Sequence, residues 1–189
     1  MTSPRVVDAR KGQEDALFAE QDAILLRRMR EEDERRRTRE ALVAATGLQD
    51  DDTLEVLLEA GIEPETLGAF ALLPMAAVAW ADRHLAHEER MAALAAAERC
   101  GLARGEAGWR LLERWLVREP SPVLISAWKA YMQAQAQRLD GAAWQNLKQD
   151  VLSNARAVAR AAGGFLRLGS GISDKERSVL RRVEDALAD

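Results

Sequence analysis

One short segment of the chain gathers side chains that commonly bind metal ions. It contains Asp82, His84, His87 and Glu89, and the two histidines are the only ones in the sequence. Carboxylate oxygens bind hard cations such as Ca²⁺, whereas imidazole nitrogens favour Zn²⁺ and other borderline metals. We therefore predict a weak site for a divalent cation at this turn, for Ca²⁺ if carboxylates alone bind it and for Zn²⁺ if the histidines take part. No organic cofactor is expected.

The same local pattern occurs a second time near the end of the chain. In each copy an aliphatic residue is followed four positions later by a glutamate and then by an arginine. The two copies are Leu85, Glu89 and Arg90, and Ile172, Glu176 and Arg177. We therefore interpret the two stretches as halves of a pseudo-repeat, and we treat Asp174 and Glu176 as a second candidate acidic turn.

Both glutamates also have an interpretation as helix caps. Each is expected at the third position of a helix, where a carboxylate accepts hydrogen bonds from free N–H groups and interacts favourably with the helix dipole. Ser173 and Glu176 have the spacing of a full capping box, whereas Ala86 has no side chain that could cap a helix. Glu89 is therefore the stronger candidate for a ligand, and Glu176 the stronger candidate for a cap.

Motifs of catalytic sites are missing from the sequence. It contains no G-x-S-x-G nucleophile elbow, no H-E-x-x-H zinc motif and no G-x-G-x-x-G loop after a strand. A metal-dependent hydrolase that used Asp82, His84 and His87 would lack identifiable oxyanion donors and a general base. We therefore expect a protein that is not an enzyme.

The first turn also carries a resemblance to a known family. The segment VAWADRHLAHEERMAALAAA (Val78–Ala97) resembles the A-D-G-x-[IV]-x-x-x-E motif of TerB-like, tellurite-resistance-associated domains, and Ala155–Leu180 resembles their second half. In this chain Arg83 stands where the motif has glycine, and Ser170 replaces the second aspartate. The resemblance implies a compact helical domain without enzymatic activity, an acidic surface associated with divalent cations, and a role in stress or defence.

Helical periodicity runs through the whole chain, and no alternating run of β-branched residues indicates a strand. We expect an all-α fold, a compact multi-helix bundle of TerB-like type with an N-terminal helical arm. The arm is assigned to residues 1–46 and the helical domain to residues 47–189, including a short acidic helix at residues 52–60.

The apolar positions predict which residues form the core. The helix that begins at Ala142 has the clearest apolar face, because its large residues recur at steps of three and four. These positions are Trp144, Leu147, Val151, Ala155, Val158 and Ala162. Four further aromatic residues fall on apolar faces at helical spacing and are also assigned to the core: Trp109, Trp115, Trp128 and Tyr131.

The arm changes character along its length. Leu17, Ile24 and Met29 give its first part an apolar stripe, but the run Arg30–Glu40 contains no large apolar residue and is expected to be solvated. Acid–base pairs four residues apart stabilise such a helix by about 0.2–0.5 kcal/mol each. An alternative function follows, in which the protein is an interaction or scaffold protein that self-associates or docks through this arm. The acidic turns would then act only as helix caps.

Composition and charge narrow the class of partner. The 27 basic and 31 acidic residues give a net charge of −4, which argues against nucleic acid as a partner. No Lys or Arg lies between Glu40 and Asp82, so an acidic surface is expected there. The longest apolar run, Gly68–Ala81, is too short to span a bilayer. We therefore expect no transmembrane segment. The single cysteine, Cys100, and the lack of a signal peptide favour a cytoplasmic protein. We expect its partner to be another protein, whose identity the sequence does not indicate.

Overall fold

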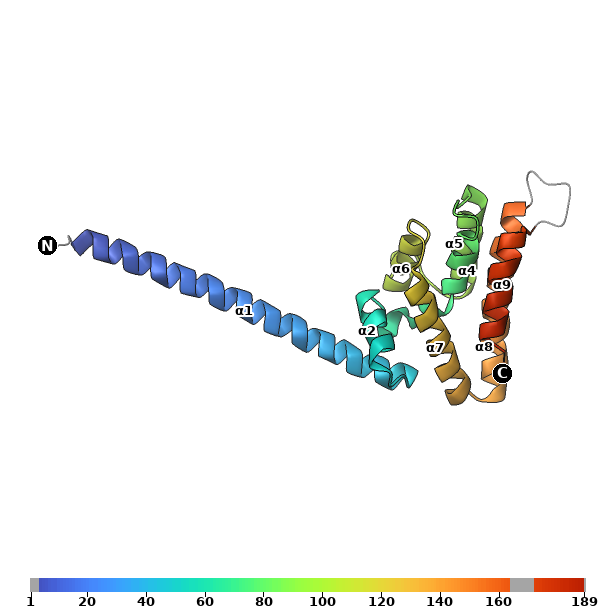
Figure 1. The fold of residues 1–189 in the computed structure, drawn as a ribbon, viewed down its shortest axis with the longest axis horizontal. Coiled ribbons are helices and arrows are strands. Elements are labelled where there is room, and N and C mark those ends of the chain that lie inside the picture. Colours follow the sequence, from blue (N-terminus) through green and yellow to red (C-terminus); the bar gives the residue numbers. More distant parts are fainter. Residues whose placement is uncertain (1–3, 164–171, 189) are drawn as a thin grey trace. The chain divides into compact units, whose positions relative to one another are not determined.

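The computed structural model describes residues 4–163 and 172–188 (Figure 1). All regular elements in these two ranges are helices, and no strand occurs within them. The predicted all-α fold class is therefore confirmed. The chain divides into two units, Met1–Glu40 and Ala41–Asp189. No helix in the described ranges is both long and apolar enough to cross a membrane.

Helix α1 is a single long helix, Pro4–Thr46, and most of it belongs to the first unit. Every side chain from residue 18 to residue 37 is exposed, as expected for a solvated helix. Ion pairs within the helix support it, among them Arg36 with Asp33, whose Nη2 and Oδ1 atoms lie 2.9 Å apart. The last six residues belong to the second unit, where Leu42 is fully buried.

The second unit consists of short and medium helices joined by tight turns. Its elements are α2 (Asp51–Glu59), η1 (Pro64–Thr66), α3 (Leu67–Ala71), α4 (Leu73–Ala79), α5 (His87–Arg99), α6 (Ala107–Trp115), α7 (Pro122–Arg138), α8 (Gly141–Gly163) and α9 (Asp174–Ala186). The acidic helix begins one residue earlier than predicted. The reason is that Asp50 is its N-cap and accepts a hydrogen bond from the Thr53 backbone N–H at 2.8 Å.

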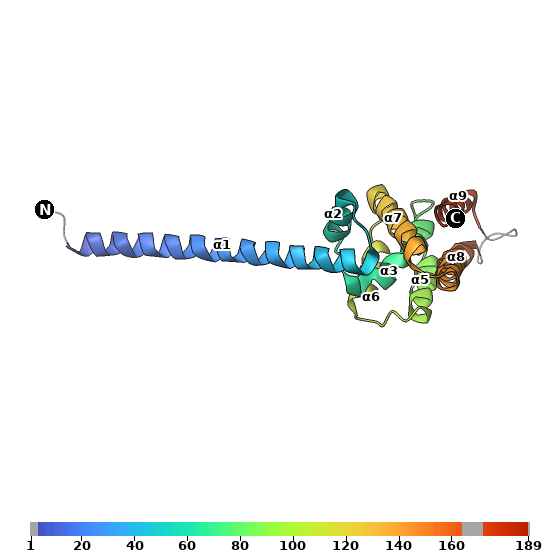
Figure 2. The same ribbon diagram turned by 90° about the horizontal axis from the view of Figure 1, so that it is seen from below.

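Two helix pairs, α4 with α5 and α8 with α9, carry the two predicted acidic turns. Helix α4 packs against both α8 and α9. Helix α5 packs against α8 (Figure 2). Alanines fill these contacts, and their small side chains allow the backbones to approach closely. The fully buried alanines of the four helices are Ala76, Ala79, Ala93, Ala96, Ala97, Ala155 and Ala159.

The predicted aromatic core is confirmed. Trp109, Trp115, Trp128 and Tyr131 are all buried, with exposed fractions of 1–7%. The Trp128 indole N–H donates to the backbone carbonyl of Ala71 at 3.3 Å, which ties α7 to the end of α3. On α8, Trp144, Val151, Ala155 and Val158 are buried as predicted and Leu147 is partly buried, whereas the side chain of Ala162 lies outside the described part.

Candidate functional site

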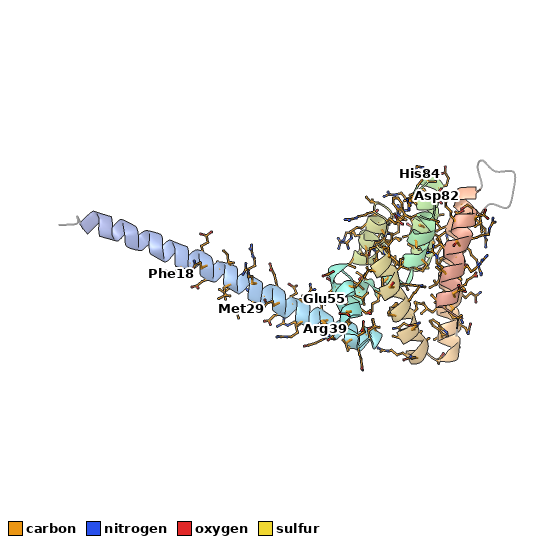
Figure 3. The ribbon with its side chains drawn as sticks, in the orientation of Figure 1. Phe18, Met29, Arg39, Glu55, Asp82 and His84 are labelled. Carbon is orange, nitrogen blue, oxygen red and sulfur yellow. The ribbon has the colours of Figure 1, made fainter. Side chains whose placement is uncertain are left out.

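Asp82 shapes the turn between α4 and α5. Its Oδ1 atom accepts a hydrogen bond from the backbone N–H of His84 at 2.9 Å, the geometry of an Asx turn. The intervening residue, Arg83, has a φ of 68°, in the left-handed region that favours glycine. Asp82 and His84 are both exposed (Figure 3), and so is His87 at the start of α5. The carboxylate of Asp82 therefore holds the backbone of the turn.

Glu89, in contrast, is buried, with only 4% of its surface exposed. It is the third residue of α5, and its Oε2 atom accepts a hydrogen bond from the backbone N–H of Ala86 at 2.7 Å. This is the glutamate half of a capping box. The other half is missing because the alanine side chain has no acceptor, so the predicted capping role of Glu89 is confirmed for one N–H group.

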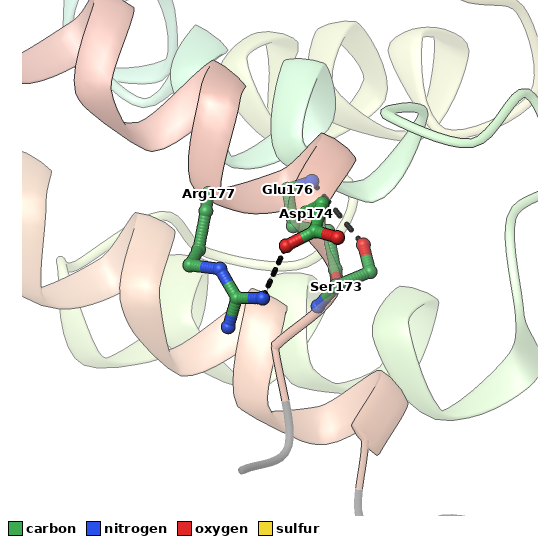
Figure 4. Close-up of polar contacts among 4 residues, drawn as sticks. All are labelled: Ser173, Asp174, Glu176 and Arg177. Carbon is green, nitrogen blue, oxygen red and sulfur yellow. Dashed lines mark hydrogen bonds and ion pairs between the residues drawn. The ribbon is translucent and has the colours of Figure 1, made fainter.

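The second turn repeats this geometry with a complete capping box (Figure 4). The Oε2 atom of Glu176 accepts from the Ser173 backbone N–H at 2.5 Å, and the Ser173 hydroxyl oxygen accepts from the Glu176 backbone N–H at 3.2 Å. Glu176 is 5% exposed. Asp174 is exposed and pairs with Arg177, and the hydrogen bond from that guanidinium lowers the pKa of Asp174.

The two buried glutamates influence each other electrostatically. Burial raises the pKa of Glu89 to about 7, against the hydrogen bond from Ala86, which lowers it. The negative charge of Glu176 raises the pKa of Glu89 further, with smaller contributions from Asp82 and Glu88. The Oε1 atom of Glu176 is buried and has no hydrogen-bond partner among the described residues. The fold therefore places a second buried carboxylate within electrostatic range of Glu89 and leaves one oxygen of Glu176 without a donor among the described residues.

The predicted site residues thus differ in how deeply they are buried. Among the four residues of the first turn, only Glu89 is buried, and its electrostatic partner Glu176 comes from the second turn. Within the part of the chain that the structure describes, no three His, Cys, Asp or Glu side chains form a set of metal ligands. Sequence reasoning identified both glutamates and their equivalence, but not their mutual approach. The pseudo-repeat was the signal that could have suggested it.

Two buried carboxylates that lie near each other are stabilised by positive charge, either a shared proton or a bound cation. Comparisons with family models, with curated proteins and with solved structures find no match for the chain.

The capping box allows a direct test of the local geometry. We expect Ser173→Ala to lower the free energy of unfolding by about 0.5–2 kcal/mol, because the Glu176 backbone N–H loses its acceptor. Urea unfolding measures the change. Ser153→Ala is a matched control on the exposed face of α8, and we expect it to change stability by less than about 0.5 kcal/mol. Equal small effects of both substitutions would contradict the cap.

Proposed function

We propose that this chain is a non-enzymatic helical binding module and that Glu89 and Glu176 together bind a divalent cation. The observation that carries the proposal is the buried Oε1 atom of Glu176, which has no donor within the described ranges and lies in the field of a second buried carboxylate. A buried acceptor without a partner costs about 1–3 kcal/mol, and a cation would satisfy the Oε1 atom of Glu176 and offset the repulsion between the two carboxylates.

The donor atoms favour a hard cation. Both buried groups supply oxygen, which suits Ca²⁺ or Mg²⁺, and both histidines are exposed. Two carboxylates fill only part of the coordination shell of the ion, and backbone carbonyls and water must fill the rest. We therefore propose a weak affinity. The resemblance to TerB-like domains supports this proposal, and the setting in stress or defence that it implies is part of the same hypothesis.

Thermal and urea unfolding with added metal test the proposal. A ligand that binds only the folded state stabilises it by RT ln(1 + [L]/Kd), so 1 mM Ca²⁺ with a Kd of 0.1 mM raises the free energy of unfolding by about 1.4 kcal/mol. We expect this increment in the wild type at pH 8, and we expect Glu176→Gln to abolish it. The double substitution of His84 and His87 by Ala is the matched control and should keep it.

Two results would contradict the cation site. Wild-type unfolding curves that coincide with Ca²⁺, Mg²⁺ and chelator would leave the glutamates as caps only. An increment that appears with Zn²⁺ alone and disappears in the histidine variant would move the site to the exposed imidazoles of the first turn.

A second candidate function rests on α1. Five large apolar side chains of this helix are 39–62% exposed: Phe18, Ile24, Leu25, Leu26 and Met29. Phe18, Leu25 and Met29 are spaced by seven and four residues, which places them on one face of the helix. The following charged run contains both signs, so two copies of α1 can pair without net repulsion. We propose that the helix self-associates through this face.

Light scattering tests the self-association. We expect the full chain to have the mass of an oligomer at about 0.1 mM, and we expect the triple substitution of Phe18, Leu25 and Met29 by Ser to reduce it to the monomer mass. A triple substitution of the charged residues Glu32, Arg35 and Arg39 by Gln controls for general effects on the helix. A monomeric wild type would contradict this second function and leave the cation site unaffected.

A further inference from the structure

A cavity of about 360 Å³ lies among α4, α7, α9 and the chain segments next to them. Two tryptophans line it, and both indole N–H groups already have acceptors. Trp80 donates to the Trp115 carbonyl at 2.8 Å, and Trp128 donates to the Ala71 carbonyl. The partly exposed ring of Trp80 therefore offers apolar surface rather than a hydrogen bond, and the buried ring of Trp128 forms part of the cavity wall. The volume lies in the range of small-molecule sites.

The charged side chains around this cavity are mostly basic. Arg83, Lys129 and Arg182 line it together with a single acid, Glu119. None of the four forms a salt bridge with another described residue. Arg182 donates its Nε–H to the Ser178 carbonyl at 3.4 Å, which leaves its two terminal amino groups for other partners. A local excess of positive charge is notable in a chain whose net charge is −4.

The backbone conformation of Arg83 is a second, independent indication of a binding site at this cavity. It is the one described residue other than glycine with a positive φ, 68°, a conformation that costs an L-residue about 1 kcal/mol relative to glycine. The Asx turn of Asp82 holds the backbone in this conformation. The arginine side chain adds charge to the cavity from a position where glycine would be less strained. Residues in such conformations are concentrated at functional sites.

The basic surface continues beyond the cavity. A shallower hollow shares Trp80 and Arg83 with it and adds Arg90, His84 and His87. No acidic side chain lines this second hollow. Arg90 therefore adds positive charge near Arg83, and the neighbouring acid Asp82 bonds the turn backbone and lines neither hollow, which favours an anion at the rim that the two hollows share.

We propose that the cavity binds a small amphipathic anion, with an aromatic or branched aliphatic body and one carboxylate, sulfonate or phosphate group. The body lies against the partly exposed ring of Trp80 and the apolar wall to which Trp128 contributes. The anionic group lies among the charged ends of Arg83, Lys129 and Arg182, where charge-assisted hydrogen bonds hold it. This site is distinct from the carboxylate pair of the proposed function and does not depend on it.

The probe for this proposal is 1-anilinonaphthalene-8-sulfonate, which joins an apolar aromatic body to one anionic group. We expect its fluorescence to rise and saturate on addition to the folded full-length protein. Arg182→Gln should weaken its binding about 5- to 10-fold, because one charge-assisted contact is lost. Arg181→Gln is the matched control, since Arg181 is the exposed neighbour on α9 and does not line the cavity.

Two further measurements distinguish the loss of a charged contact with the probe from a general effect on folding. Arg83→Gly should also weaken binding of the probe about 5- to 10-fold, but it should leave the melting temperature unchanged or raised, because glycine relieves the positive φ. The uncharged analogue N-phenyl-1-naphthylamine should bind the wild type and Arg182→Gln with equal affinity.

The proposal would be overturned by any of three results. The probe could fail to saturate on the folded protein, Arg181→Gln and Arg182→Gln could weaken it equally, or Arg83→Gly could leave its affinity unchanged. Each of these would show that the basic side chains around the cavity do not hold the anionic group. The carboxylate pair of the proposed function would be unaffected by all three.

Discussion

Trp128→Ala is expected to lower the free energy of unfolding by about 3–5 kcal/mol, the largest effect of any single substitution considered for this chain. The side chain is 1% exposed and lies on α7 in the middle of the core. Truncation removes the burial of the indole and leaves a cavity that the surrounding helices fill only in part. It also leaves the Ala71 carbonyl without its donor, which adds to the cost.

Urea unfolding followed by circular dichroism measures this loss. One further variant separates the contribution of the ring from that of the N–H donor, and another serves as a control. Trp128→Phe keeps an aromatic ring but removes the N–H donor, so we expect it to cost less than Trp128→Ala and more than zero. Gln133→Ala changes an exposed residue of the same helix and should alter stability by less than about 0.5 kcal/mol. A loss below about 1 kcal/mol for Trp128→Ala would show that the ring is outside the core.

The helices and their ends could be predicted because their signals are local. Ser173 caps α9, as its spacing to Glu176 predicts, and Ser121, which directly precedes a proline, caps α7. Gly101 follows α5 with a φ of 84°, as expected for a glycine that ends a helix. The apolar face of α8 follows from spacing alone. Each of these features depends on residues within a few positions of one another in the sequence.

The candidate site could be predicted only in part, because its geometry depends on packing between distant segments. The pattern identified Glu89 and Glu176 as equivalent, and the structure confirms that each caps its own helix. It did not show that Asp82 would bond the backbone of its own turn, or that both histidines would be exposed. The basic cavity was missed entirely, because its three cations come from separate parts of the chain and form no local motif.

Glu89→Gln is expected to make the stability of the protein less dependent on pH. In the folded state the pKa of Glu89 is raised to about 7, from 4.5 in the unfolded chain. Between these values the folded state holds a proton that the unfolded state has released, so stability falls as the pH rises. Below pH 4.5 the full stabilisation is present, and above about pH 7 it is lost. The loss amounts to about 1–3 kcal/mol.

Urea unfolding of the wild type and of Glu89→Gln at pH 5 and pH 8, both in chelator, tests whether stability falls as the pH rises. Glutamine is neutral at both values, and its amide oxygen can still accept from the Ala86 backbone N–H. We therefore expect the variant to be more stable by less than about 1 kcal/mol at pH 5 and by about 1–3 kcal/mol at pH 8. Glu88→Gln, at the exposed neighbouring position, should show a much smaller change between the two pH values.

Added Ca²⁺ then shows whether the carboxylate pair is stabilised by a bound cation or by a shared proton. If the pair binds the cation, Ca²⁺ at pH 8 restores stability to the wild type and does little for Glu89→Gln, because the metal replaces the proton that is lost at high pH. If the pair only shares a proton, Ca²⁺ changes neither protein and the difference at pH 8 persists. Equal stability of both proteins at pH 5 and at pH 8 would contradict the raised pKa itself, and with it the repulsion between Glu89 and Glu176 on which the cation site depends.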